Sequence, residues 1–466
     1  MTKNKSKLLF YTIGTIAPGF MSLATIPLFS FMLSKEELGF YDLLISSINL
    51  FAPIISLQLG YACYCSAREE PELSKKANII KTILIFSSIF HVILFIVSWL
   101  VSPYFDLIYT THFLFITISA SFFSVLGLIA RALEKQKVFV FSSIANAFGI
   151  FIFSALLFYF GKKGIEPIIY AYICTNCLTI GFLIFSLKLP KIIFQGHYNS
   201  RILQESLHFS LPLIPNALSW WFVNLANRYI ITYYLGVGAN GVFAVATKIP
   251  SILNVCSSVF TLMLQDISFT DQKNKKDDAY YDLLFKKLFI IQLASCLVIV
   301  AFGKPLTSLF FSPIYAETYR LIPLILAGSL FANFASFWGI FYQLEKKTTT
   351  ILKTNVYGAI FNCVITLLFI KYIGLYAPAL GTMTGFLSMW LMRMKSKIVH
   401  RKFDLPIGLI TQLLLVFFVF SLLILSGNLY INYLLMIASI VILVYSISSI
   451  TPNWKRYFKR KHSTLN

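Results

Sequence analysis

The chain has 466 residues, of which 58% are hydrophobic and only 12% are charged, and its formal net charge is +21. Because a membrane-spanning helix takes roughly 20 predominantly apolar residues, this composition allows about fourteen spans and leaves no stretch long enough for a separate soluble domain. The Lys and Arg residues lie in short clusters between apolar runs, so the charge favours a membrane surface over nucleic acid as a partner.

The apolar runs predict an all-α integral membrane protein of about fourteen transmembrane helices, because they are long and do not alternate as barrel strands do. The first run follows Lys3, Lys5 and Lys7 without an A-x-A-like cleavage site, so we expect a retained span rather than a signal peptide. The predicted spans are residues 8–33, 40–65, 79–101, 112–130, 138–160, 165–187, 210–234, 241–264, 285–302, 320–342, 351–371, 374–392, 406–426 and 429–449.

The placement of Lys and Arg predicts the orientation of these spans. The two tails and alternate connections hold most of the 39 Lys and Arg residues, whereas the opposite connections hold six and only Arg228 and Lys248 fall inside spans. We therefore expect both termini in the cytoplasm.

Three short matches indicate an internal repeat. LSKEELGFY at 33–41 matches LGVGANGVF at 235–243, LEK at 133–135 recurs at 344–346, and KGIEP at 163–167 resembles IGLYAP at 373–378. Six helices in each half give both halves the same orientation, as in some transporters. The predicted organisation is an N-terminal lobe (1–190), a cytoplasmic linker (191–209), a pseudo-symmetric C-terminal lobe (210–395), and two additional helices with a basic tail (396–466).

Arg228 and Lys248 are the clearest functional candidates, because an ionisable residue inside a span is costly unless it meets a partner or water. Each lies about 10 Å below the outer end of its helix, so we expect them to face one another. Polar and aromatic residues at helical spacing accompany both cations. These companions are Trp220, Asn224 and Asn227 before Arg228, and Ser251, Asn254 and Ser258 after Lys248.

With Pro250 interrupting the backbone hydrogen bonds beside them, these residues predict a cationic cavity wall, and no acidic residue is expected close to either cation. Such a site suits a phosphate or pyrophosphate group. The alternative is that Arg228 and Lys248 extend to the outer interface and that the Ser and Asn residues only join helices. Asp42 and Glu166, near outer ends, are interpreted as interface residues. The Cys pairs at 63/65 and 174/177 are interpreted as small hydrophobes, so neither a metal nor a cofactor is expected.

The segment NLANRYIITYYLGVGANGVFAVATKIPSIL at 224–253 resembles the most characteristic part of Wzx-type polysaccharide repeat-unit flippases, of the multidrug/oligosaccharidyl-lipid/polysaccharide exporter superfamily. LSKEELGFYDL at 33–43 and RALEKQKVF at 131–139 look similar to the same family. The resemblance implies a transporter rather than an enzyme, with two lobes around a cationic cavity and alternating access.

The resemblance further implies movement of an undecaprenyl-pyrophosphate-linked oligosaccharide from the inner to the outer leaflet of the bacterial cytoplasmic membrane. The product would serve O-antigen (lipopolysaccharide), capsule or exopolysaccharide synthesis, with membrane lipids, a polysaccharide polymerase and chain-length proteins as partners. On this chain the implied cavity residues are Arg228 and Lys248. The chain departs from the related peptidoglycan-precursor flippases, because no Arg or Lys lies between Leu8 and Leu33.

Two rival functions stay open. A multidrug or cation exporter of the same superfamily needs buried carboxylates in its lumen, which the peripheral placement of Asp42 and Glu166 does not favour. A membrane-embedded polysaccharide polymerase or glycosyltransferase usually carries catalytic carboxylates on a sizeable outer loop, and the longest outer connection here is near 303–319.

Overall fold

The structure is a computed structural model. It describes residues 17–21, 23–101, 110–271, 278–345, 348–395 and 407–463. Their regular structure is entirely helical, so the predicted all-α class is confirmed over these residues. The chain forms two compact units, Met1–Gly241 and Val242–Asn466. The sequence analysis predicted an N-terminal lobe that ends at residue 190 and a C-terminal lobe that begins at residue 210. These bounds rest on the sequence repeat and stay a prediction.

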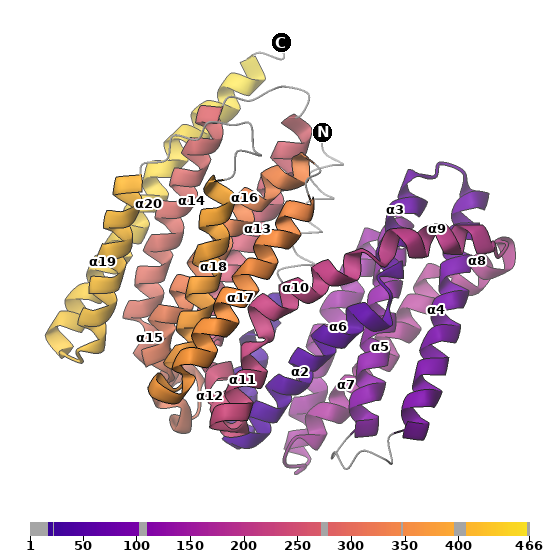
Figure 1. The fold of residues 1–466 in the computed structure, drawn as a ribbon, viewed down its shortest axis with the longest axis horizontal. Helices are drawn as coiled ribbons and strands as arrows, with labels where there is room; N and C mark the ends of the chain where they lie inside the picture. Colours follow the sequence, from indigo (N-terminus) through magenta and orange to yellow (C-terminus); the bar gives the residue numbers. More distant parts are fainter. Residues whose placement is uncertain are drawn as a thin grey trace. The chain divides into compact units, whose positions relative to one another are not determined.

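The first unit consists of helices that pack mainly on α5 and α7 (Figure 1). After an apolar helix over Ala17–Met32, its elements are α2 (Lys35–Ile55), α3 (Leu59–Glu69), α4 (Leu73–Val101), α5 (Thr110–Ala132), α6 (Gln136–Tyr159), α7 (Glu166–Leu187), α8 (Leu189–Gln195), α9 (Ser200–Ser210), α10 (Leu213–Leu225), α11 (Asn227–Leu235) and the start of α12 (Val237–Ala246).

The second unit is built around α16, α17 and α18, which pack closely on one another. Its elements are α13 (Lys248–Asp271), α14 (Asp278–Ala301), α15 (Gly303–Phe310), the 3₁₀ helix η2 (Pro313–Leu321), α16 (Ile322–Leu344), α17 (Thr348–Ile373), α18 (Tyr376–Lys395), α19 (Ile407–Leu425) and α20 (Leu429–Ser463).

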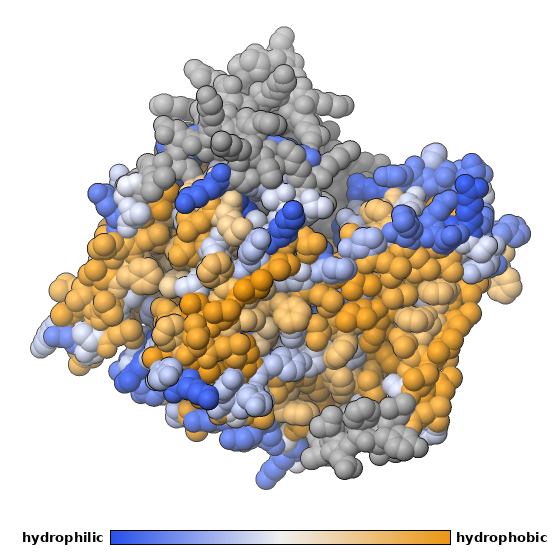
Figure 2. All heavy atoms as spheres, viewed as in Figure 1, coloured by the Kyte–Doolittle hydropathy of each residue, from blue (hydrophilic) through white to orange (hydrophobic). Residues whose placement is uncertain are grey.

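Within the described ranges, nine helices are long and apolar enough to cross a membrane, and the bent pair α12 and α13 makes a tenth candidate. Two shorter apolar helices, Ala17–Met32 and Ile410–Leu425, coincide with predicted spans. On the face shown in Figure 2, hydrophobic residues cover the sides of the first unit's helices, while hydrophilic residues gather over α9 and the neighbouring ends of α3 and α4. The chain is therefore a multi-pass membrane protein, and the count of fourteen stays a prediction.

Two predicted spans are each divided into two helices. The span 40–65 breaks at residues 56–58, because Leu57 and Gln58 adopt the left-handed backbone conformation, with φ of 46° and 54°, which a helix cannot continue. The span 210–234 breaks at a turn at Ala226 between α10 and α11. The prediction of one continuous helix was wrong in both cases.

Helix boundaries agree with the predicted repeat. The offset of 202 residues that relates the first matched pair also relates the starts of α2 at Lys35 and α12 at Val237. The offset of 210 for the third pair likewise relates the starts of α7 at Glu166 and α18 at Tyr376. The matched segments therefore occupy the same position in equivalent helices.

The linker consists of α8 and α9, which are fixed to α4 by hydrogen bonds. Lys81 Nζ donates to the Gly196 carbonyl oxygen at 2.9 Å, and the His197 amide donates to Asn78 Oδ1 at 2.6 Å. Much of the predicted cytoplasmic charge lies outside the described residues, including Lys3, Lys5, Lys7 and the segments 272–277, 346–347 and 396–406.

Candidate functional site

The start of α12 crosses the start of α2 at a pair of glycines. A Cβ atom on Gly39 would overlap the carbonyl oxygen of Val237, and one on Gly241 would overlap that of Lys35. Under the 202-residue offset Gly39 corresponds to Gly241 and Lys35 to Val237, so each half of the contact repeats the other. Glycine allows this backbone approach because it has no side chain, and the crossing places Asn240 beside α2.

Asn240 joins this crossing to a carboxylate. Its side chain is fully buried, and its Nδ2 donates to the Gly39 carbonyl oxygen at 3.0 Å and to Asp42 Oδ2 at 3.3 Å. A buried amide is costly unless it is hydrogen-bonded. The donors of Asn240 therefore fix the position of the Asp42 carboxylate on α2.

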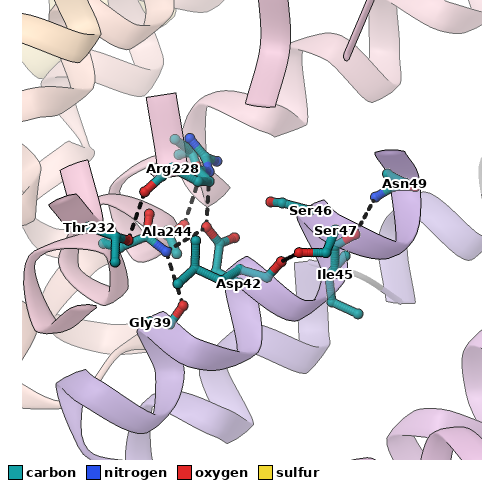
Figure 3. A network of polar contacts seen from close by, with 12 residues as sticks. Gly39, Asp42, Ile45, Ser46, Ser47, Asn49, Arg228, Thr232 and Ala244 are labelled. Atoms are coloured by element: carbon teal, nitrogen blue, oxygen red, sulfur yellow. Dashed lines mark hydrogen bonds and ion pairs between the residues drawn. The ribbon is translucent and has the colours of Figure 1, made fainter. Parts of the chain in front are cut away.

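The same carboxylate oxygen forms an ion pair with Arg228 of α11 (Figure 3). Arg228 Nε lies 2.9 Å from Asp42 Oδ2, and the two side chains are only 10% and 15% exposed. Thr232 Oγ1 donates to the Arg228 carbonyl oxygen at 2.8 Å, within the same helix. The result is a buried site with one cation and one anion held between α2 and α11.

This ion pair corrects one sequence interpretation. We expected no acidic residue near Arg228, which was wrong; the interpretation of Asp42 as an interface residue stays a prediction. The two residues meet because α11 packs on α2, a tertiary contact between distant segments that spacing along the chain does not encode. The charge of Arg228 is therefore balanced by a fixed anion in this structure.

The predicted polar stripe is divided by the break at Ala226. On α10, Trp220 is 61% exposed and Asn224 donates from Nδ2 to its carbonyl oxygen at 2.8 Å. On α11, Asn227 and Arg228 are buried. The structure therefore does not place the four residues in one environment, because Trp220 is exposed on α10 whereas Asn227 and Arg228 are buried on α11.

Trp221 and Tyr229 make contacts with α2 that the sequence analysis did not predict. Trp221 Nε1 donates to the Ser46 carbonyl oxygen at 2.7 Å, and the Tyr229 hydroxyl lies 2.5 Å from Ser47 Oγ. These bonds hold α10 and α11 against α2 on either side of the break. The signal available in the sequence was a Trp in an apolar helix, since a buried indole N–H usually finds an acceptor.

Lys248 and Asn254 belong to the second unit and lie on α13. Lys248 is the first residue of that helix and is half-buried, directly after a 47° bend between α12 and α13. Pro250 lies in the first turn, as expected for a residue that interrupts backbone hydrogen bonding. Asn254 is exposed, and its Nδ2 donates to Ser329 Oγ of α16 at 3.4 Å.

A second buried arginine was missed because it lies at the predicted end of a span. Arg393 of α18 is 5% exposed and donates to Thr354 Oγ1 at 3.0 Å, Asn355 Oδ1 at 2.8 Å and the Ala335 carbonyl oxygen at 2.6 Å. All three acceptors are uncharged. Arg393 therefore connects α16, α17 and α18 through hydrogen bonds to neutral groups.

The seven cysteines are unpaired thiols, and the described part of the chain contains no cluster of three or more His, Cys, Asp or Glu residues arranged to hold a metal ion.

Comparison with known proteins identifies a family and a fold. A family model described as polysaccharide biosynthesis protein matches residues 5–265. No curated protein matches the chain.

Solved structures share the fold at low sequence identity. The lipid II flippase MurJ in an inward closed conformation has a TM-score of 0.72 at 16% identity, and the match covers 96% of this chain and 99% of that chain. An inward-facing multidrug resistance MATE family transporter of the MOP superfamily has a TM-score of 0.66 at 16% identity, covering 82% of this chain and 93% of that chain. A MATE structure in the straight conformation has a TM-score of 0.59 at 16% identity, covering 83% and 94%. The chain therefore has the fold of these transporters, as the sequence predicted.

Proposed function

This chain belongs to the polysaccharide biosynthesis protein family, and from that premise we propose that it is a flippase for a lipid-linked oligosaccharide. The proposed substrate is an undecaprenyl-pyrophosphate-linked repeat unit, moved from the inner to the outer leaflet of a bacterial cytoplasmic membrane for O-antigen, capsule or exopolysaccharide synthesis. Both termini would be cytoplasmic, and a polymerase with chain-length proteins would use the product.

The observation that carries the proposal is the buried pair of Arg228 and Asp42, inside the segment that the family model matches. A buried ionised pair is costly to desolvate, and replacing such a pair with apolar residues is often neutral or stabilising. Its presence is better explained by a task that needs a cation. A guanidinium binds phosphate oxygens in two parallel hydrogen bonds, which suits a pyrophosphate headgroup.

In the proposed cycle, Arg228 exchanges its partner between Asp42 and the pyrophosphate. Binding then requires the Asp42 contact to break, so the net affinity is lower than that of an unpaired buried arginine. A transporter benefits from this exchange because a substrate drives a conformational change only through its different affinities for the two states. After release, Asp42 takes Arg228 back and the site is reset.

Lys248 is proposed as the second cation for the headgroup, and Trp220, Asn224, Asn227 and Asn254 as further substrate contacts. The oligosaccharide would cross in a hydrated passage while the polyprenyl tail remains in lipid, because transferring its hydrocarbon to water is unfavourable.

The test is complementation of a deletion strain. The strain is scored for surface polysaccharide and for lipid-linked repeat units trapped in the inner leaflet, after expression of wild type, Arg228→Ala, Lys248→Ala or the control Arg201→Ala. Arg201 is a matched control because its ion pair with Glu205 is solvent-exposed. We expect the wild type and Arg201→Ala to restore polymer, and Arg228→Ala and Lys248→Ala to insert without restoring it. Full export by the Arg228→Ala/Lys248→Ala double variant would refute the role of these cations.

A cation or multidrug exporter is the second candidate, because Asp282 is a buried carboxylate and Asp42 is a largely buried one. This function predicts that the deletion leaves polymer and intermediates unchanged and raises sensitivity to cationic dyes. The same strain therefore separates the two functions.

A further inference from the structure

Two adjoining cavities lie inside the first unit, along α2 and α5. They enclose about 270 and 290 Å³, and Ile48, Asn49 and Ala120 line both of them. Since the shared residues connect the two spaces, we treat them as one feature, the α2–α5 groove.

The groove carries polar side chains on a mostly apolar lining, and it is uncharged. No described residue that lines it carries a carboxylate, an ammonium or a guanidinium group. Its polar lining consists of Thr25, Tyr41, Asn49, Asn146, Tyr172 and Asn176 in the first cavity and of Ser56, Gln58, Tyr61 and Ser124 in the second. A cation or an anion of any size would find no countercharge on these residues, whereas a neutral molecule with both C–H and O–H groups would find polar side chains set among apolar ones.

Hydrogen bonds fix the amides at one end of the groove. Asn146 Nδ2 donates to Asn176 Oδ1 at 3.0 Å and to Thr179 Oγ1 at 3.2 Å, and Asn176 Nδ2 donates to Ser119 Oγ at 2.9 Å. This arrangement leaves Asn146 Oδ1 without a donor among the described residues. Because the network satisfies the amide nitrogens, it orients the remaining oxygen before any ligand arrives.

Two tyrosines extend the same wall. The hydroxyls of Tyr41 and Tyr172 are 3.2 Å apart, so one donates to the other and further bonding capacity remains on the pair. Farther along α2, Asn49 Nδ2 donates to the Ile45 carbonyl oxygen at 3.0 Å, which leaves its Oδ1 available. Tyrosine combines an apolar ring with a polar end, a combination that matches the alternating C–H and O–H groups of a sugar.

We propose that the α2–α5 groove binds the uncharged sugar portion of the transported molecule. This inference rests on the proposed function, because it assigns to the first unit the part of the substrate that the cations do not recognise. Pyrophosphate recognition and sugar recognition would then depend on different residues.

The experiment measures binding of a lipid-free probe to purified full-length protein in nanodiscs. The probe is the neutral oligosaccharide released by mild acid from the host's lipid-linked pool, detected by saturation-transfer NMR and titrated; inorganic pyrophosphate is titrated separately. The variants are Asn49→Ala and Asn146→Ala, which remove polar groups, and Ala120→Leu, which adds bulk where the two cavities meet. Asn432→Ala on α20 is the matched control outside the groove.

We expect wild type and Asn432→Ala to bind the oligosaccharide equally. Loss of a neutral hydrogen bond should weaken binding by Asn49→Ala and Asn146→Ala about threefold to tenfold each, Ala120→Leu should reduce it similarly, and pyrophosphate binding should not change. Because the three variants change three different positions, one that fails to fold leaves the others informative.

The groove proposal is overturned if wild type does not bind the lipid-free oligosaccharide, or if the groove variants bind it as wild type does. The proposed function is tested by a different experiment. It is refuted if the deletion strain keeps its surface polymer and accumulates no lipid-linked intermediates. Oligosaccharide binding that depends on the groove residues would support the groove even in that case.

Discussion

Neutralising one partner of the Arg228–Asp42 pair should destabilise the protein more than the loss of one contact suggests. At 2.9 Å and an effective dielectric constant of about 20, Coulomb's law gives a gross attraction of roughly 6 kcal/mol, which desolvation of both groups offsets in large part. Removing one partner leaves the other charge buried, at a cost of about 3 to 5 kcal/mol. The Asp42→Asn/Arg228→Gln double variant keeps neutral hydrogen-bonding groups and should lose only about 2 kcal/mol.

The assay is a double-mutant cycle on the free energy of unfolding in mixed micelles. Wild type, both single variants and the double variant are compared under one set of conditions, so the coupling energy follows from four measurements. The control is the same cycle on Arg201 and Glu205, whose side chains are 85% and 67% exposed. That pair should show a coupling below about 1 kcal/mol.

Additive single losses would refute the reasoning, because they would mean that the two charges do not interact in the folded protein. A second readout tests the proposed exchange of partners. Asp42→Asn releases Arg228 from its competitor, so inorganic pyrophosphate should bind this variant more tightly than wild type, whereas Arg228→Gln should bind it more weakly. Unchanged affinity in Asp42→Asn would separate the ion pair from substrate binding.

Three further variants have expected effects on the free energy of unfolding in micelles. Gly241→Ala places a methyl group against the backbone of α2 and should cost at least about 2 kcal/mol, while Gly181→Ala faces open space and should gain about 0.5 kcal/mol. Arg393→Lys loses the planar donor geometry that meets three acceptors, so it should cost about 3 kcal/mol. The control Arg201→Lys, at an exposed position, should cost less than about 0.5 kcal/mol. Ser34→Ala removes the capping box of α2 and should cost about 1 kcal/mol. For each of these variants, an unchanged free energy of unfolding would contradict the contact from which the effect is expected.

Long apolar helices were predictable because length and composition alone define them. The predicted spans 138–160 and 165–187 agree with α6 and α7 to within two residues, since turn-forming Gly161 and Gly164, both at positive φ, separate them. Neither signal depends on tertiary contacts. The breaks at residues 56–58 and at Ala226 were not predictable in the same way, because no Gly or Pro lies at either position and hydrophobicity continues across both.

The candidate site was only partly predictable. Arg228 stood out because a charge interrupts an apolar run, but Asp42 was assigned to the interface from its distance to the helix end. The groove was missed for a related reason: Asn49, Asn146 and Asn176 lie in three helices, and one amide in an apolar run is an ordinary feature. Their shared environment exists only after α2, α6 and α7 have packed.

The predicted repeat distinguishes the ion pair from the glycine crossing beside it. The glycine crossing is symmetric, but the polar residues around it are not: the position equivalent to Asn240 is Leu38, and the position equivalent to Asp42 is Ala244. Leu38 is fully buried, so an apolar side chain on α2 takes the position that the Asn240 amide takes on α12. The symmetric backbone contact therefore supplies the scaffold, and the Asp42–Asn240–Arg228 network is an addition on one side of it. Under the proposed function, Arg228 exchanges its partner while the contact between the two glycine-bearing helix starts is kept, because that contact is made by backbone atoms.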